Sequence, residues 1–221
     1  MPDDNDMNAK IITEFIGTFF LCLTICIAAA FGVAGDFAPF AIAGTLMVMI
    51  YAGGHISGAH YNPAVTISIW IRGACDRSDL IPYILSQMVA GAVAALVTAN
   101  LIITGPVADE FTMQMFDPHS DQTIPILVSE LLFTFALVYV ILNVATSEST
   151  EGNGYYGAAI ASVVLAGALT VGTISLASFN PAVTLSLSIA GKMAYADMWI
   201  HLVPQLLGGC AASYAFLSTD G

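Results

Sequence analysis

The chain has 221 residues, of which 57% are hydrophobic and only 9% are charged, and its mean hydropathy is +0.84. A soluble domain carries about 25% charged residues, so this composition indicates a membrane protein. The formal net charge of −12 comes from 16 acidic and 4 basic residues. Such an acidic chain does not suit nucleic acid or anionic lipid headgroups as binding partners.

Six stretches contain no Asp, Glu, Lys or Arg, and most of them are long enough to cross a bilayer, which takes roughly 20 apolar residues in a helix. They are residues 15–35, 37–71, 80–108, 131–147, 152–191 and 198–219. The N-terminal MPDDNDMN is acidic, and no small-residue cleavage pattern follows a short apolar core. We therefore expect the first stretch to remain as a helix and not to be removed as a signal peptide.

The stretches form two sets of three on either side of the acidic segment 109–121. Because three is an odd number of crossings, the second set must enter the membrane from the opposite side, which predicts an inverted repeat. Similar residues recur 118 or 116 positions apart: Asn62 and Asn180, Gln87 and Gln205, Gly91 and Gly209, Glu14 and Glu130. We predict one membrane domain over residues 1–221, with repeats at 10–108 and 122–219.

The stretches at 37–71 and 152–191 are too long for one crossing, which uses about 20 to 25 residues. Each is expected to hold a crossing followed by a second, shorter helix. In the first, we predict a crossing near 38–54, breaks at Gly53–Gly54 and Gly58, and a new helix from Asn62. In the second, we predict a crossing near 155–174, a bend at 173–179, and a new helix from Asn180.

The segments HYNPAVTIS (60–68) and SFNPAVTLS (178–186) place Asn-Pro at the start of each shorter helix. Asn is a strong N-cap residue, and Pro suits the next position because no amide partner exists there. In a soluble protein the motif would indicate only a capped helix. A helix that begins inside a membrane also leaves backbone groups that need protein or a water-filled cavity. We expect the two starts to meet near the midplane.

The segments HISGAHYNPAVT (55–66) and ASFNPAVT (177–184) resemble the aquaporin and glycerol-facilitator family, and the likeness covers roughly residues 10–217. The resemblance implies an all-α membrane fold with six transmembrane helices and two re-entrant half-helices in an inverted repeat. It implies one pore per subunit and a homotetramer in the bilayer. The pore motifs would be Asn62, Pro63, Ala64, Asn180, Pro181 and Ala182.

The segments TEFIGTFF and SELLFTF match the family's glutamate-bearing helix openings. The resemblance therefore implies that Glu14 and Glu130 are buried acceptors that brace the loops leading to the two NPA motifs. Ionisable groups at membrane depth are functional candidates by default, so ion coupling in a secondary transporter is the alternative for these two residues. For His55 and His60, before the first half-helix, we favour packing and hydrogen bonding over a pH-sensing role in the vestibule.

Each half-helix carries the equivalent of about half a positive charge at its N-terminus, so a cation between the two starts is repelled twice. The side-chain amides of Asn62 and Asn180 can both donate to one passing oxygen. The sequence thus predicts a passive channel for water and small neutral solutes that excludes ions and protons. The alternatives are an ion- or proton-coupled transporter and a small-anion channel. We expect no enzyme activity, no metal and no cofactor, since no catalytic or metal-ligand spacing is present.

Most members of the family have an arginine directly after the second NPA, but this chain has Val183. By register, the other positions of the selectivity filter fall on Ile42, Ala168 and Ala177. Valine at the arginine position also occurs in the family's plant vacuolar branch, whose members pass ammonia or urea besides water. We expect a wide filter that admits ammonia, urea or glycerol, unless a Phe or Tyr from the loop at 105–123 refills the space.

The few basic residues predict the orientation in the membrane. With both termini inside, Lys10, Arg72 and Arg77 fall on the cytoplasmic side and Lys192 falls outside, in agreement with the positive-inside tendency. We expect a multi-pass protein of the plasma membrane with cytoplasmic termini.

Overall fold

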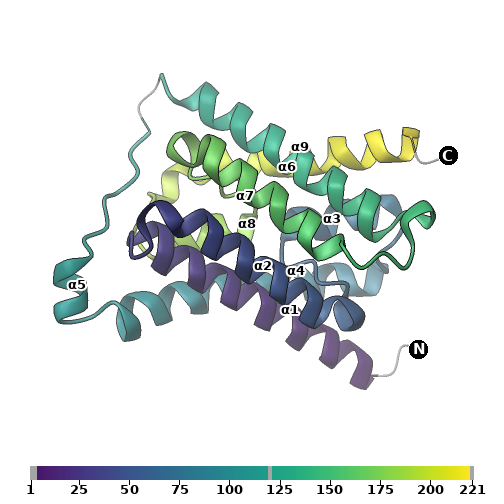
Figure 1. The fold of residues 1–221 in the computed structure, drawn as a ribbon, viewed down its shortest axis with the longest axis horizontal. Helices are drawn as coiled ribbons and strands as arrows, with labels where there is room; N and C mark the ends of the chain where they lie inside the picture. Colours follow the sequence, from purple (N-terminus) through teal and green to yellow (C-terminus); the bar gives the residue numbers. More distant parts are fainter. Residues whose placement is uncertain (1–3, 119–120, 220–221) are drawn as a thin grey trace.

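In a computed structural model of the chain, we describe residues 4–118 and 121–219, which form a bundle of helices (Figure 1). Within these ranges, six helices are long and apolar enough to cross a bilayer. They are α1 (Asp4–Ile25), α2 (Ala38–Ser57), α4 (Arg77–Val97), α6 (Thr123–Ala145), α7 (Tyr156–Ser175) and α9 (Trp199–Thr219). Short π-helical turns extend α1 over Cys26–Ala30 and α4 over Thr98–Ile102.

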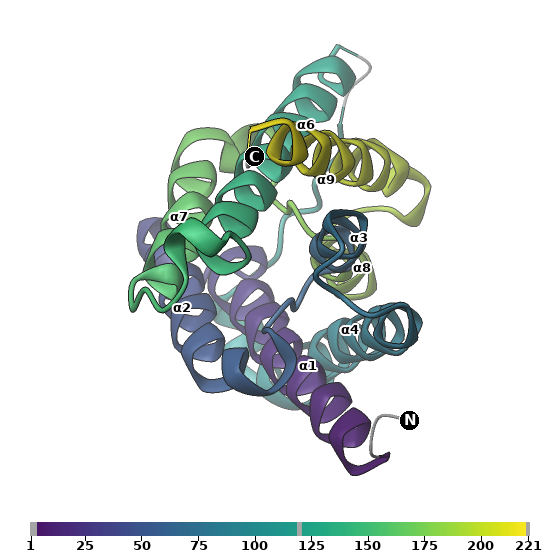
Figure 2. The same cartoon turned by 90° about the vertical axis from the view of Figure 1, so that its right-hand side faces the viewer.

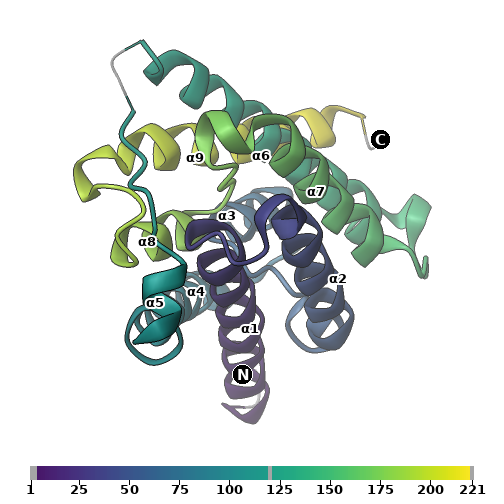
Figure 3. The same cartoon turned by 60° about the vertical axis from the view of Figure 1, so that its left-hand side comes forward.

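The two ends of the bundle differ, and we name them by what they hold. Both chain termini lie at one end, which we call the terminal end (Figure 1). The other end, the loop end, holds α5 (Pro106–Glu110) and the segment between α5 and α6, which passes α8 (Figure 3). The 3-10 turn Glu148–Thr150 joins α6 to α7 at the terminal end, whereas the 3-10 turns Gly35–Phe37 and Tyr195–Asp197 lie at the loop end.

Two short helices, α3 (Pro63–Arg72) and α8 (Pro181–Ile189), occupy the centre of the bundle (Figure 2). Both begin near the middle of the molecule, and they run in opposite directions, α3 toward the terminal end and α8 toward the loop end. The predicted helix starts after Asn62 and Asn180 are therefore present. Six long helices around two re-entrant half-helices is the predicted all-α membrane fold.

One predicted break in the first half is wrong. Helix α2 continues through Gly53–Gly54 and ends at Ser57, where Gly58 takes a left-handed backbone with φ of 82°. Glycine at position 53 serves close packing within this helix, since a Cβ there would clash with the Tyr61 hydroxyl group. In the second half, α7 ends at Ser175, close to the predicted boundary.

Two glycines at equivalent positions let long helices approach the half-helices. A Cβ at Gly91 would lie 2.6 Å from the carbonyl oxygen of Ala182, and a Cβ at Gly209 would lie 2.6 Å from the Ser68 hydroxyl oxygen. A larger residue at Gly91 would meet the backbone of α8, and one at Gly209 would have to displace the Ser68 side chain, with the Ala64 carbonyl oxygen 3.3 Å away. The central position of the half-helices thus depends on these two close approaches.

Candidate pore

The two NPA motifs each cap their own helix and also hold the other one. The Asn62 side-chain oxygen accepts from the Ala64 amide at 2.9 Å, and the Asn180 oxygen accepts from the Ala182 amide at the same distance. The Asn62 side-chain nitrogen donates to the Phe179 carbonyl oxygen, and that of Asn180 donates to the Tyr61 carbonyl oxygen, both at 2.9 Å. The two hydrogen bonds from the side-chain nitrogens join the half-helices start to start.

Each asparagine retains a donor for a passing molecule. A side-chain amide has two N–H donors, and the cross-links above use one of them. Asn62 and Asn180 both line the central cavity, although each is only 4% exposed. The geometry therefore leaves one N–H of each amide for an oxygen atom in the cavity, between the N-termini of α3 and α8.

Glu14 lies in α1 and binds the loop before the first NPA. Its carboxylate accepts from the Ser57 hydroxyl group at 2.7 Å and from the backbone amides of His60 and Tyr61 at 2.9 and 2.7 Å. The side chain of Gln87, in α4, donates to it at 2.8 Å. The carboxylate is fully buried, and these donors are the hydrogen-bond partners that a buried charge requires.

Glu130 makes the equivalent contacts in the second half. Its carboxylate accepts from the Ser175 hydroxyl group at 2.7 Å and from the backbone amides of Ser178 and Phe179 at 3.0 and 2.8 Å. The Gln205 side chain donates at 2.8 Å. Both glutamates and both glutamines thus lie in one arrangement that occurs twice, as the repeated spacing in the sequence predicted.

Both loops hold non-glycine residues in the left-handed backbone region. Ala59 and Tyr61 have φ of 53° and 50°, and their equivalents Ala177 and Phe179 have φ of 47° and 50°. L-residues rarely adopt these angles, which cost on the order of 1–3 kcal/mol each. The amides of Tyr61 and Phe179 are the ones that the glutamates accept from. The glutamates therefore hold a loop shape that the chain would not otherwise keep.

One cavity of about 1530 Å³ runs past both NPA motifs. Apolar side chains from α1, α2, α3, α6 and α7 form most of its lining; they include Leu21, Leu46, Val65, Ile141 and Ile160. At the terminal end, Glu148 and Glu151 lie at its margin, and at the loop end Asp36 and Lys192 do. Between these ends the lining is mostly apolar, and its polar groups include Asn62, Asn180, His60 and Ser178.

The four predicted filter residues all line this cavity: Ile42, Ala168, Ala177 and Val183. Val183 is 2% exposed and packs in a cluster with Cys22 and Leu187. Because the four side chains are apolar, they offer a solute no hydrogen-bond partner.

Sequence reasoning did not single out four further lining residues, Gln114, Met115, Phe116 and Lys192. The first three come from the loop between α5 and α6, and Lys192 follows α8. We left open that a Phe or Tyr from the loop at 105–123 refills the space beside the filter. Phe116 is an aromatic residue of this loop that lines the cavity. Only the folded chain shows this, because the loop lies 67 residues from Val183 in the sequence and has no periodic pattern.

His60 is packed and hydrogen-bonded, and His55 lies in the last turn of α2 and not in the loop. The Nδ1 atom of His60 lies 3.2 Å from the Thr66 hydroxyl oxygen, and its ring is edge-on to Tyr83 with 5.1 Å between ring centres. Both histidines also line the cavity. The packing role that we favoured for His60 agrees with these contacts.

Residues 3–216 match the sequence model of the major intrinsic protein family. The chain is 34% identical over 219 residues to Aquaporin NIP1-1 of Zea mays, covering 94% of this chain and 73% of that protein. The chain belongs to the major intrinsic protein family. It is also 32% identical over 221 residues to Aquaporin Z of Photorhabdus laumondii, covering 92% of this chain and 94% of that protein.

A solved structure supports the fold of this major intrinsic protein. The aquaglyceroporin from Plasmodium falciparum matches it with a TM-score of 0.79 at 20% sequence identity, over 96% of both chains. Family membership confirms the predicted resemblance and the multi-pass membrane architecture. It also confirms that the chain is a channel protein and not an enzyme.

Proposed function

We propose that this chain is a passive pore for water and for small neutral solutes such as ammonia, urea or glycerol, and that it excludes ions and protons. The observation that carries the proposal is the meeting of the α3 and α8 N-termini at Asn62 and Asn180, inside a cavity with apolar walls. Relatives that share about a third of its residues bear the name aquaporin, which supports this reading.

Electrostatics at the NPA motifs favours neutral solutes. The N-terminus of each half-helix acts as about half a positive charge, and a cation between them would leave its hydration shell to meet both. A water or hydroxyl oxygen can instead accept from the remaining N–H of Asn62 and of Asn180. A water molecule held by both asparagines points its hydrogens away from them, so it is poorly placed to relay a proton along the pore.

The contacts of the two glutamates weigh against an ion-coupled transporter. Such a protein needs an ionisable group that exchanges its partner for an ion during transport. The carboxylates of Glu14 and Glu130 are fully buried and accept from loop amides, a serine and a glutamine. We therefore assign them a bracing role, as the family resemblance implied.

The filter supports passage of solutes larger than water. The filter has no fixed cation, because Val183 occupies the position where most family members have arginine. Its other three residues, Ile42, Ala168 and Ala177, are also apolar. Two of the four side chains are methyl groups, so they occupy little of the cavity. We propose that these residues admit small neutral solutes and that ion exclusion depends mainly on the NPA region.

The membrane orientation and the assembly also belong to this proposal. Lys10, Arg72 and Arg77 lie toward the terminal end and Lys192 lies at the loop end, so we propose that the terminal end faces the cytoplasm. Residence in the plasma membrane and a homotetramer follow from the family resemblance alone.

Stopped-flow light scattering on proteoliposomes tests the proposed function. We expect osmotic water permeability above that of protein-free vesicles, together with measurable entry of ammonia, urea or glycerol. Aggregated or heat-denatured protein reconstituted at the same ratio is the control. A pore that conducts water but excludes all three solutes would show that the apolar filter is not a wide one.

A further inference from the structure

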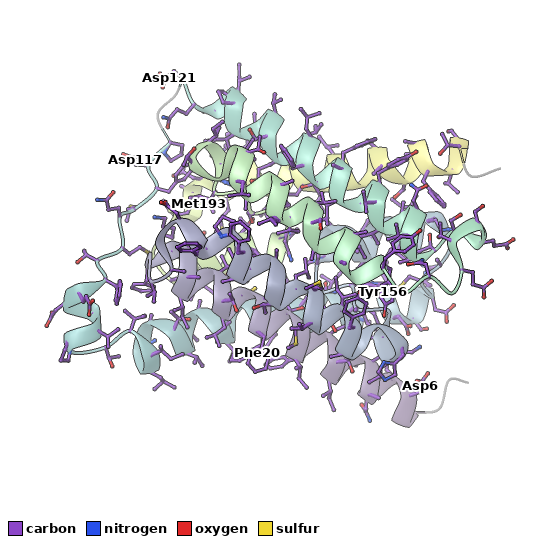
Figure 4. All side chains as sticks on the ribbon, viewed as in Figure 1. Asp6, Phe20, Asp117, Asp121, Tyr156 and Met193 are labelled. Atoms are coloured by element: carbon purple, nitrogen blue, oxygen red, sulfur yellow. The ribbon has the colours of Figure 1, made fainter. Side chains whose placement is uncertain are left out.

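Residues Met113 to Phe116, which we name the strap, lie at the loop end, where Gln114, Met115 and Phe116 line the cavity. The Phe116 amide donates to the Lys192 carbonyl oxygen at 2.7 Å, and Phe116 pairs in parallel with Met193. In the opposite direction, the Lys192 ammonium group donates to the Gln114 carbonyl oxygen at 2.7 Å. These two hydrogen bonds join the strap to the turn that follows α8. Met193 lies at this end of the molecule in Figure 4.

The strap is packed at both of its ends. Met113 packs against the cluster that contains Val183 and Leu187. The ring of Phe116 meets the buried ring of His201 edge-on, with 6.2 Å between ring centres and 73° between ring planes. The strap is therefore held in one place by side-chain packing as well as by hydrogen bonds.

The strap and the apolar filter residues lie along the same path. Gln114, Met115 and Phe116 line the cavity together with Val183. The strap can therefore contact a solute that enters at the loop end. Since Phe116 and Met115 are much larger than the alanines of the filter, the strap is the place where bulky side chains meet an entering solute.

Lys192 is suited to hold the strap because its hydrogen bond is charge-assisted. Hydrogen bonds from an ammonium group are roughly twice as strong as those between neutral groups. Among the described residues that line the cavity, Lys192 is the only lysine or arginine. Partial burial lowers the pKa of its ammonium group, and the Gln114 carbonyl oxygen replaces part of the lost hydration.

We propose that Lys192 is a selectivity-determining residue of this channel: it holds the strap across the mouth, so that the strap and not the apolar filter sets the largest solute admitted. The proposal rests on the proposed function, since only a conducting pore has a size limit. It makes Lys192 act from the turn after α8, nine residues beyond the position where most family members have arginine.

The test compares Lys192→Met with Lys192→Arg in proteoliposomes. Methionine has a similar length but neither charge nor donor, whereas arginine keeps both. We expect the ratio of glycerol to water permeability to rise roughly fivefold in Lys192→Met. Because the Lys192 hydrogen bond is solvent-exposed, water weakens it to about the strength of one ordinary hydrogen bond, and its loss corresponds to this factor. In Lys192→Arg the ratio should stay near the wild-type value. Asp109→Asn, which changes a charge on the exposed surface of α5 at the same end but outside the cavity lining, is the control for charge alone and should also leave the ratio unchanged.

A second variant, Phe116→Ala, keeps the proposal open to refutation if Lys192→Met does not fold. It removes the ring contact with His201 and should raise the same ratio. Unchanged ratios in Phe116→Ala and in folded Lys192→Met would overturn the proposal, even with a wild type that conducts every solute. If instead the wild type excludes glycerol and urea, the wide-pore function fails, and glycerol entry in either variant would still support the strap as the limit.

Discussion

Asn62 and Asn180 perform two structural tasks with one short side chain each. The oxygen accepts from the amide two residues later, and the nitrogen donates to the carbonyl group that precedes the other asparagine. Aspartate could accept in the same way but has no N–H to donate. The capping half of this arrangement is local, so the sequence predicts it. The cross-link depends on a residue about 118 positions away, and no local rule indicates it.

Replacing Asn180 with Asp should weaken cation exclusion. A carboxylate offsets the positive N-terminus of α8 and faces the Tyr61 carbonyl oxygen without a donor. A change of roughly 1–2 kcal/mol in the barrier, the size of a favourable helix-end interaction, corresponds to about a tenfold rise in cation current. Planar-bilayer recording measures it. The matched control is Asn100→Asp, at an exposed asparagine near the end of α4. A folded, solute-conducting Asn180→Asp as ion-tight as the parent would refute the assigned role.

Restoring arginine at position 183 should narrow the pore. The new side chain fills space in a filter of small apolar residues and provides donors that water can use. We expect Val183→Arg to lower glycerol permeability about tenfold, a barrier increase of roughly 1.4 kcal/mol, and to lower water permeability much less. Val183→Leu adds volume without donors, so it should lower both permeabilities together. Equal losses of water and glycerol in Val183→Arg would contradict the filter assignment.

The conformation of the loops before α3 and α8 depends most on residues that are distant in the sequence. The left-handed positions of these loops hold Ala59, Tyr61, Ala177 and Phe179 and not the glycine that such angles favour, so the sequence alone does not reveal this shape. It does place a repeated Glu and Gln around the loops, and the resemblance gave the glutamates their role. The wrong break at Gly53–Gly54 has the opposite cause, because a glycine needed for close packing looks the same in sequence as one that ends a helix.

Replacing Glu130 with Gln should destabilise the second loop. One carboxylate oxygen becomes an NH₂ group that faces hydrogen-bond donors, and a buried unsatisfied group costs roughly 1–3 kcal/mol. We expect a lower thermal unfolding temperature in detergent and reduced water permeability in proteoliposomes. Glu110→Gln makes the same change at an exposed position of α5 and should have no effect. An unchanged melting temperature in Glu130→Gln would rule out a bracing role.

The overall helical architecture follows from the number and spacing of the apolar stretches, which the sequence shows directly. Six long helices and two half-helices that begin at its centre match those expectations. The strap could not be predicted, because residues 113–116 have no periodicity and their partner Lys192 lies more than 70 positions away. Long-range loop contacts of this kind form only once the helices are in place.

The proposed orientation, with the terminal end in the cytoplasm, can be tested by cysteine labelling. We expect single cysteines at Asn8 and Ser218, both exposed in the structure, to react with a membrane-impermeant maleimide only after cells are permeabilised. The parent for this experiment has its four native cysteines replaced by alanine. A cysteine at Tyr195, exposed near the loop end, should react in intact cells. Labelling of positions 8 and 218 from opposite sides would end the six-crossing arrangement.

The central claim is that the pore conducts neutral molecules and not ions, and parallel water and proton fluxes on one proteoliposome preparation test it most directly. Stopped-flow scattering gives the water permeability, and a trapped pH dye with valinomycin and a potassium gradient gives the proton flux. We predict that water permeability increases with the amount of protein reconstituted while proton flux stays at the level of protein-free vesicles. A proton flux that increases with the amount of protein would contradict this account and would favour a proton-conducting or proton-coupled transporter.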